Sequence, residues 1–212
     1  MTGPRPPGPG RPVLVVATNN PGKLAEFRRL LTGRPWTVTS LAEAGWSGDL
    51  VEPGETYAEN ALAKAATVCS ALGLTTLADD SGIEVDALAG WPGPLSARWL
   101  GAAATDEERL AGLIAEVDRR APAARRVRYV CAVSLCRPGG TTIAARGECV
   151  GTLVDPRGTR GFGYDPAFLS EDLGETFGEA TDAAKDRVSH RARALRNLLA
   201  PGTLNPDRGA QG

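Results

Sequence analysis

Several common signals are missing from this sequence of 212 residues. Its four cysteines, Cys69, Cys131, Cys136 and Cys149, do not have the paired spacing of a metal site. Basic and acidic residues number 24 and 25, so no basic surface for nucleic acid and no acidic tail is indicated. No apolar run approaches the length of a membrane span, and the first residues lack the pattern of a secretory signal. We therefore expect a cytoplasmic protein with reduced, buried thiols that binds neither nucleic acid nor a membrane.

The composition is that of an ordinary folded protein. Hydrophobic residues make up 42% and charged residues 23%, and the length fits one large domain or two lobes that share a cleft. Residues 1–12 are almost entirely glycine, proline, arginine and threonine, which cannot form a core. We predict a disordered extension over 1–12, a folded domain over 13–200 and a flexible tail over 201–212.

The stretch Asp79–Gly82 combines two carboxylates, a hydroxyl and a glycine at the end of a predicted strand, Leu74–Ala78. This composition favours a junction between strand and loop, where acidic side chains can converge on a cation. One carboxylate could then hold the metal while the other orients a water molecule. A plain surface turn is the alternative. The long apolar segment that follows, residues 88–99, contains glycine and proline and favours a functional loop.

A strand buried on both faces is predicted over Val13–Ala17, which is a continuous apolar run. The polar turn Thr18–Lys23 follows it, and Leu24, Phe27 and Leu31 then recur at helical spacing. Such a turn places free backbone N–H groups and a lysine at a helix N-terminus, which can bind phosphate. The spacing of a P-loop is absent. A capped helix start with an exposed lysine is therefore an equally good interpretation.

Further elements are predicted from capping and turn signals. The capping boxes Thr56–Glu59 and Thr105–Glu108 each begin a helix, and Gly73 ends the first of these helices. Two strand-like segments, 127–136 and 141–150, are joined by a Pro-Gly-Gly turn and predict an antiparallel hairpin. A strand is also expected through Trp36, Val38 and Leu41, and a last helix carries Val188, Ala192, Leu195 and Leu199 on one stripe.

Two stretches near the C-terminal end carry candidate ligands for a planar base. Phe162 lies between two glycines, so its ring can stand clear of the backbone and stack on a base. A glycine-rich turn with core aromatics is the alternative. His190 is the only histidine and stands between serine and arginine near a predicted helix start. An isolated histidine is usually structural or simply exposed.

Four separated stretches together resemble the inosine triphosphatase-like family of purine nucleoside triphosphate pyrophosphatases. The similarity spans roughly Val13 to Leu199, which is nearly the whole folded chain. Each motif alone is weak, whereas all four in the order of the family are specific. They are Thr18–Lys23 with Glu26, Asp79–Gly82 with Pro92-Gly93 and Ser96-Ala97-Arg98, Gly161–Pro166, and Ser189-His190-Arg191.

The resemblance implies an α/β fold with a long mixed central sheet flanked by helices, in two lobes with the active cleft between them. It implies a homodimer that uses Mg²⁺ to hydrolyse dITP, ITP and XTP to the nucleoside monophosphate and pyrophosphate. This reaction removes deaminated purines from the nucleotide pool. One departure is Ala184, where the family commonly has an acidic residue before the lysine.

The resemblance also implies roles for individual residues. Asp80 is the catalytic base and, with Glu52, forms the metal site, while Asp79 supports it or binds the metal through water. Phe162 stacks on the purine, and His190 and Arg191 read its edge. The other implied substrate contacts are Thr18, Asn19, Asn20, Pro21, Gly22, Lys23, Lys64, Ser81, Gly163, Tyr164, Asp165 and Lys185.

Two other classes of protein share part of this pattern. A non-catalytic nucleotide-binding module would keep the pocket without hydrolysis, but the acidic residues and Lys23 argue against it. A serine hydrolase would combine Ser81, His190 and an aspartate. Ser81 lacks the GxSxG sequence of a nucleophile elbow, which argues against this second alternative.

Overall fold

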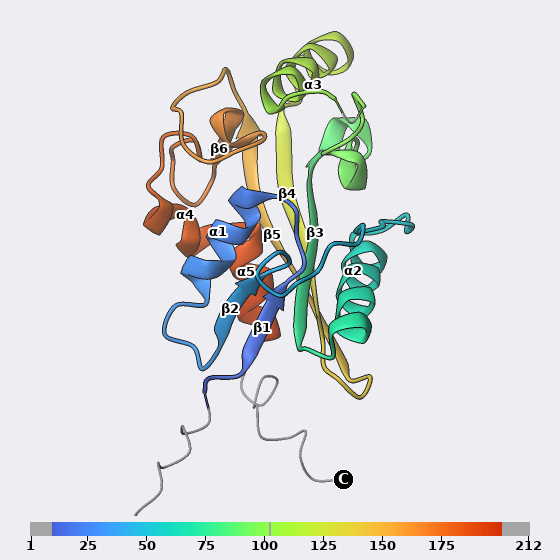
Figure 1. Ribbon diagram of the computed structural model, residues 1–212. Coiled ribbons are helices and arrows are strands. Elements are labelled where there is room, and N and C mark those ends of the chain that lie inside the picture. Colours follow the sequence, from blue (N-terminus) through green and yellow to red (C-terminus); the bar gives the residue numbers. More distant parts are fainter. Residues whose placement is uncertain (1–9, 102, 201–212) are drawn as a thin grey trace, which may run out of the picture.

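The structure, a computed structural model, describes residues 10–101 and 103–200. One sheet of six strands, in the order β2-β1-β3-β4-β5-β6, carries helices on both faces (Figure 1). The predicted α/β class with a mixed central sheet is confirmed. The strands are β1 Val13–Val16, β2 Thr37–Ser40, β3 Thr76–Val85, β4 Arg126–Cys136, β5 Thr142–Leu153 and β6 Phe168–Ser170. The helices are α1 Pro21–Leu30, α2 Tyr57–Leu72, α3 Asp106–Arg120, α4 Asp182–Val188 and α5 His190–Leu198.

The two ends of the chain are only partly covered by this description. Residues 1–9 of the predicted extension and the whole predicted tail, 201–212, lie outside the described residues. Within the described ranges, no helix is long and apolar enough to cross a membrane. The four cysteines are free and buried, as expected.

Parallel and antiparallel pairing divide the sheet. β1 is parallel to β2 and to β3, whereas β3, β4, β5 and β6 pair antiparallel in succession. β4 and β5 form the predicted hairpin. β3 and β4 pair over the full length of β3, from Thr76↔Cys136 to Val85↔Val127, and are the two central strands of the sheet.

Alternate side chains of β1 are buried on opposite faces of the sheet. Leu14 and Val16 pack with Phe27 of α1 and with α5, whereas Val15 packs with Val68 of α2. All of them have no exposed surface. β1 is therefore buried on both faces, as its continuous apolar run predicts.

A third apolar cluster lies at the other end of the sheet, where Figure 1 shows α3 and β6. Leu113 and Val117 of α3 pack there with Ile83 and Val85 of β3 and with Phe168 of β6. One lobe is thus built around α1, α2 and α5, and the other around α3. The long strands β3 and β4 run through both lobes, so they fix the position of one lobe relative to the other.

Local capping signals are confirmed at both predicted helices. At α2, the Thr56 side chain accepts the N–H of Glu59, and the Glu59 carboxylate accepts the N–H of Thr56. Thr105 and Glu108 make the same exchange at α3. α2 ends at Gly73 with φ of 62°, a left-handed conformation that glycine adopts without strain.

The prediction of a junction between strand and loop at Asp79–Gly82 is wrong, because β3 continues through these residues. Every residue of this stretch pairs with β4, and these tertiary contacts override the weak strand propensity of aspartate and glycine. Successive side chains of a strand point to opposite faces. Asp79 therefore faces α1 and α5, whereas Asp80 faces α2. The expectation that the two carboxylates converge on one cation is thus wrong.

The predicted last helix is in fact two helices. Ser189 is extended, with φ of −61° and ψ of 154°, and it ends α4 and begins α5. Its hydroxyl accepts the N–H of Ala192 and so caps the second helix. Val188 therefore belongs to α4, while Ala192 and Leu195 lie on the buried face of α5.

Leu77 tests the lobe around α1 and α5, because it is fully buried there on β3. We expect Leu77→Ala to lower the free energy of unfolding by about 2–5 kcal/mol, since apolar contacts are lost and a cavity remains. Leu62→Ala is the matched control, because Leu62 on α2 is 43% exposed. Urea unfolding followed by circular dichroism measures both variants. Equal losses in the two would contradict this account of the core.

Candidate functional site

A cleft of about 110 Å³ opens between the two lobes. Its walls come from the turn before α1, the middle of β3, the loop after β3, the glycine-rich segment before β6 and the start of α5. Ten candidates from the sequence line it: Asn20, Lys23, Glu52, Asp80, Ser81, Phe162, Gly163, Tyr164, His190 and Arg191. The other candidates, Thr18, Asn19, Pro21, Gly22, Lys64, Asp165 and Lys185, are not among the described residues that line it.

The turn before α1 is a capped helix start. The N–H of Asn20 donates to Thr18 Oγ1 (3.1 Å), and the N–H of Lys23 donates to Asn20 Oδ1 (3.0 Å). Within the described part of the chain, the turn leaves the N–H groups of Asn19 and Gly22 without a partner. The two interpretations of this turn are therefore compatible, although fewer donors are free for an anion than the sequence suggests.

Asp80 faces α2 and reaches the cleft. Its Oδ2 accepts a hydrogen bond from Asn60 Nδ2 (2.9 Å), and its Oδ1 accepts the N–H of Ser81 (2.9 Å). Burial raises the pKa of Asp80 above its usual value, and the attraction of Lys64 and Lys23 only partly opposes this shift. A carboxylate with a raised pKa accepts a proton more readily, so Asp80 is suited to act as a base.

Asp79 is enclosed on the other face of the sheet and is 1% exposed. Its Oδ2 lies 3.1 Å from Lys23 Nζ and 2.9 Å from Arg191 Nη2. Burial disfavours the ionised carboxylate, but the charges of Lys23 and Arg191 outweigh burial and hold the pKa of Asp79 far below its usual range. Asp79 is thus a permanent negative charge that orients two cations. Its enclosure favours this role over that of a metal ligand.

Glu52 lies in the loop before α2 and is held by two cations. Its Oε1 lies 2.5 Å from Lys64 Nζ, and its Oε2 lies 2.5 Å from Arg98 Nη1. Burial disfavours ionisation, but Lys64 and Arg98 outweigh it and lower the pKa of Glu52. Glu52 is therefore ionised at neutral pH, and it holds Lys64 of α2 at the edge of the cleft.

Glu52 and Asp80 line the same cleft and have the donor chemistry that suits a magnesium ion. Among the residues that the structure describes, no group of three His, Cys, Asp or Glu side chains is arranged to hold a metal. Mg²⁺ is usually bound through one or two carboxylates, with water and substrate phosphates as its other ligands. The two carboxylates therefore fit an ion that arrives together with a phosphorylated substrate.

A chain of buried charges extends from the cleft to α1 and α4. Glu26 of α1 accepts a hydrogen bond from Arg191 and lies 2.7 Å from Lys185 Nζ of α4. Lys185 Nζ also lies 2.5 Å from Asp165 Oδ2. Burial disfavours the charge on Glu26, but Arg191 and Lys185 outweigh it and lower the pKa of Glu26. Lys185 therefore faces two carboxylates in this structure, and its expected contact with the triphosphate stays a prediction.

The guanidinium group of Arg191 has no free pair of N–H groups for bidentate contact with a ligand. Its Nε and Nη2 donate to Asp79, Nη2 also donates to Ser81 Oγ (2.9 Å), and Nη1 donates to Glu26. The side chain is 1% exposed. Because all three nitrogen atoms are engaged, the observed role of Arg191 is to fix Ser81 and the two carboxylates. Its contact with a purine stays a prediction.

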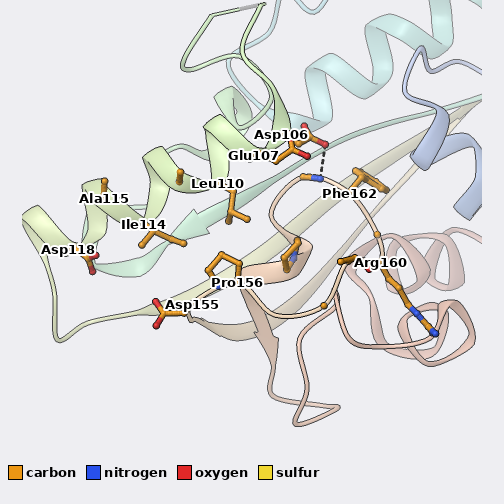
Figure 2. A pocket seen from close by; sticks show the side chains of 16 residues that line it. Asp106, Glu107, Leu110, Ile114, Ala115, Asp118, Asp155, Pro156, Arg160 and Phe162 are labelled. Carbon is orange, nitrogen blue, oxygen red and sulfur yellow. Dashed lines mark hydrogen bonds between the residues drawn. The ribbon is translucent and has the colours of Figure 1, made fainter.

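The ring of Phe162 lies over the first turn of α1. A Cβ atom added at Gly22 would collide with ring carbons of Phe162, so only glycine permits this approach. The N–H of Phe162 donates to Asp165 Oδ2 (2.9 Å). The N–H of Gly163 donates to Asp106 Oδ2 of α3 (2.8 Å), the dashed line in Figure 2. The aromatic ring is thus anchored from both lobes.

A hollow of about 810 Å³ adjoins the cleft at Phe162. Figure 2 shows Leu110 and Ile114 of α3 on one side of it and Pro156 on the other, whereas Arg160 points away. Phe162 and Gly163 line both the hollow and the cleft. Ligand pockets usually measure roughly 300–1,000 Å³. The cleft is smaller than this range, whereas the hollow that Phe162 and Gly163 also line lies within it.

His190 is a neutral imidazole in the wall of the cleft. Its ring stacks on Tyr129, with centroids 4.5 Å apart and planes at 13°. Burial and the charges of Arg191 and Lys185 hold the pKa of His190 well below its usual value. Nδ1 has no hydrogen-bond partner among the described residues. Any contact of His190 with a base therefore uses an uncharged ring.

The geometry does not support the serine hydrolase alternative. A serine nucleophile needs a hydrogen bond to its base. Ser81 Oγ instead accepts a hydrogen bond from Arg191, and the His190 ring lies flat against Tyr129. No hydrogen bond joins Ser81 to His190 in the part of the chain described here.

Three residues of the site were not assigned from the sequence: Asn60, Asp106 and Tyr129. Asp106 lies at the start of the capped helix α3, and Asn60 lies one residue after the capping box of α2. The capping signals could have drawn attention to both positions. Tyr129 carries no local signal, because its role depends on the partner strand and on His190.

The fold and the cleft define a two-lobed α/β protein with a binding site between its lobes. The chain belongs to the Ham1 family, whose model matches residues 14–201. Over 183 residues it is 46% identical to a Geobacter sulfurreducens protein named dITP/XTP pyrophosphatase, covering 86% of this chain and 92% of that relative. It is also similar to the solved Ham1 proteins of Coxiella burnetii (TM-score 0.79, 33% identity, 88% and 96% covered) and Staphylococcus aureus (0.76, 36%, 88% and 95%). The resemblance drawn from the four motifs is confirmed.

Glu26 offers a test of the buried charge chain. We expect Glu26→Gln to lower the free energy of unfolding by about 3–5 kcal/mol, because Lys185 and Arg191 lose a carboxylate partner inside the protein. Glu43→Gln is the matched control, because Glu43 makes an exposed pair with Arg28 and should contribute little. Urea unfolding at pH 7 measures both. A loss in Glu26→Gln no larger than that of the control would show that the chain is not structurally required.

Proposed function

We propose that this protein hydrolyses the non-standard purine nucleoside triphosphates dITP, ITP and XTP to the nucleoside monophosphate and pyrophosphate. The observation that carries the proposal is the cleft that brings together Lys23, the carboxylates Glu52 and Asp80, and the ring of Phe162. The cleft therefore offers a cation for phosphate, two carboxylates for a metal ion and an aromatic ring for a base. Membership of the Ham1 family and the name of the Geobacter relative support the same reaction.

The cations at the cleft would bind the triphosphate. Asp79 holds Lys23 at the cleft, Glu52 holds Lys64 beside it, and the free N–H groups of Asn19 and Gly22 lie at the N-terminus of α1. Mg²⁺ held by Glu52, Asp80 and phosphate oxygens would neutralise phosphate charge and acidify a bound water. The proposed reaction is therefore dependent on Mg²⁺.

Asp80 would orient the attacking water and take its proton. Asn60 and the N–H of Ser81 hold its two carboxylate oxygens in place. The water oxygen would form the new bond to the α-phosphorus. The bond from this phosphorus to the oxygen that bridges it to the β-phosphate would break, and pyrophosphate would leave with that oxygen. The abstracted proton then passes to solvent.

Phe162 would stack on the purine, next to Gly163 and Tyr164. His190 and Arg191 would read its edge, although all three nitrogen atoms of Arg191 already donate to Asp79, Ser81 or Glu26. Hypoxanthine and xanthine carry a keto acceptor at C6 where adenine carries an amino donor. A buried donor that adenine leaves unpaired therefore disfavours ATP. We assign Lys185 and Asp165 to the support of Phe162.

We further propose that the protein acts as a homodimer in the cytoplasm. Its four free, buried cysteines suit a reducing compartment. The exposed apolar side chains Val51, Leu95 and Leu100 are candidates for a contact with a second copy. Light scattering after size-exclusion chromatography tests the dimer directly.

A panel of triphosphates tests the reaction. The purified protein is assayed with dITP, ITP, XTP, ATP and GTP, with Mg²⁺ and with a chelator, for monophosphate and pyrophosphate. Equal amounts of both products from dITP, ITP and XTP, in the presence of Mg²⁺ only, support the proposal. Tight binding without product release would instead support a non-catalytic purine nucleotide-binding module.

Asp80→Asn keeps the shape of the side chain but removes its charge and basicity. We expect kcat for dITP to fall by about 10²- to 10⁴-fold, while a non-hydrolysable α,β-imido analogue of ITP still binds. Asp49→Asn, at an exposed position that is not among the residues lining the cleft, is the matched control. Steady-state kinetics and calorimetry measure the two effects. Turnover close to that of the control would remove Asp80 from the mechanism.

Phe162→Ala tests how the base is held. Stacking on an aromatic ring is worth about 1–3 kcal/mol per base and tolerates any purine. The substitution should therefore raise KM for ITP, XTP and ATP by the same factor, whereas Phe162→Tyr should keep the wild-type values. A change in the preference for ITP over ATP in Phe162→Ala would show that Phe162 contributes to the choice of base.

A further inference from the structure

Asn60 is a buried polar residue that connects two parts of the site. It lies on the inner face of α2 and has no exposed surface. Its Nδ2 donates to Asp80 Oδ2 (2.9 Å), and its Oδ1 accepts the N–H of Gly54 (2.8 Å). One amide group thus bonds both to β3 and to the loop that carries Glu52.

The loop on the other side of this bridge is tightly placed. Gly54 follows Glu52 by two residues, and a Cβ atom added at Gly54 would collide with Glu59 and lie 3.1 Å from Asn60 Oδ1. Lys64, one helical turn after Asn60 on α2, holds the Glu52 carboxylate directly. The same face of α2 therefore fixes the main chain and the side chain of the Glu52 segment.

A carboxamide is suited to this position because it is neutral and carries both a hydrogen-bond donor, the NH₂ group, and an acceptor, the oxygen. Its NH₂ group can face a carboxylate while its oxygen faces an N–H group. An aspartate would place two carboxylates against each other, and an apolar residue would remove the partner of the buried Asp80 Oδ2 and of the partly buried N–H of Gly54. With Asn60 and the N–H of Ser81 in place, both oxygens of Asp80 have a fixed direction.

We propose that Asn60 is a positioning residue that sets the separation of Glu52 and Asp80, and so the spacing of the two carboxylates that would share a magnesium ion. This inference rests on the proposed function. It assigns Asn60 no contact with the substrate. Asn60 acts through Asp80 and through the segment Glu52–Gly54, whereas Lys23 and Phe162 hold the nucleotide at other parts of the cleft.

Asn60→Ala tests this role. Asn197→Ala is the matched control, because Asn197 lies on an exposed part of α5 and donates to the carbonyl of Arg146 on β5. Three quantities are measured for wild type and both variants. They are the melting temperature, kcat for dITP as a function of Mg²⁺ concentration, and the affinity for α,β-imido ITP with and without Mg²⁺. The last quantity does not depend on turnover.

We expect Asn60→Ala to lower kcat by about 10- to 100-fold, as expected for the loss of a hydrogen bond to a charged group, and to require more Mg²⁺. Its affinity for the analogue without Mg²⁺ should stay within about two-fold of wild type, because Lys23 and Phe162 are untouched. The gain in affinity on adding Mg²⁺ should be lost. Asn197→Ala should keep that gain and the wild-type kcat.

Two results would overturn the inference. A folded Asn60→Ala variant that melts at a lower temperature yet keeps the wild-type response to Mg²⁺ would show that Asn60 is merely structural. If Asn60→Ala does not fold, Asn60→Ser is measured in the same way, and failure of both to fold would assign Asn60 to the core. The proposed function fails separately, if the wild-type protein itself releases no pyrophosphate from dITP.

Discussion

Arg191 joins three segments that are far apart in the sequence: Glu26 on α1, Asp79 on β3 and its own helix α5. A guanidinium group without exposed surface is tolerated only when carboxylates surround it, and each carboxylate in turn holds a lysine, Lys185 or Lys23. The packing of α1, α4 and α5 on one face of β3 therefore depends on opposite charges that cannot be removed singly. Lys23 and Arg191 belong to this set of buried charges and also line the cleft, so the charges behind the cleft continue into its wall.

The continuity of β3 explains how two adjacent residues acquire different chemistry. In a strand, neighbours enter different environments, since their side chains point to opposite faces. Asp79 meets Lys23 and Arg191, whereas Asp80 meets the neutral amide of Asn60. A turn at the same sequence would expose both carboxylates to water and make them alike. The difference in basicity on which the proposed mechanism depends is thus a product of secondary structure.

Signals that act over a few residues were sufficient to predict much of the fold, including the capping boxes at Thr56 and Thr105 and the β4–β5 hairpin. The course of β3 was not predictable in this way, because pairing with β4 overrides the preference of Asp79–Gly82 for a turn. The break at Ser189 was also missed, since the apolar stripe runs across it. Among site residues, the motifs located Asp80 and Phe162, but the partners of a buried charge follow only from tertiary structure.

The contact between Phe162 and Gly22 has a consequence for how the protein can diversify. The ring that we propose to stack on the base and the turn that we propose to bind the phosphates are in direct contact. A larger residue in the turn must push the aromatic ring aside, and a smaller ring leaves the turn uncovered. Changes at the two positions are therefore coupled, and their effects should not be additive. On the α3 side the same ring borders the hollow of about 810 Å³, so that side of the ring is less tightly enclosed than the side that faces α1.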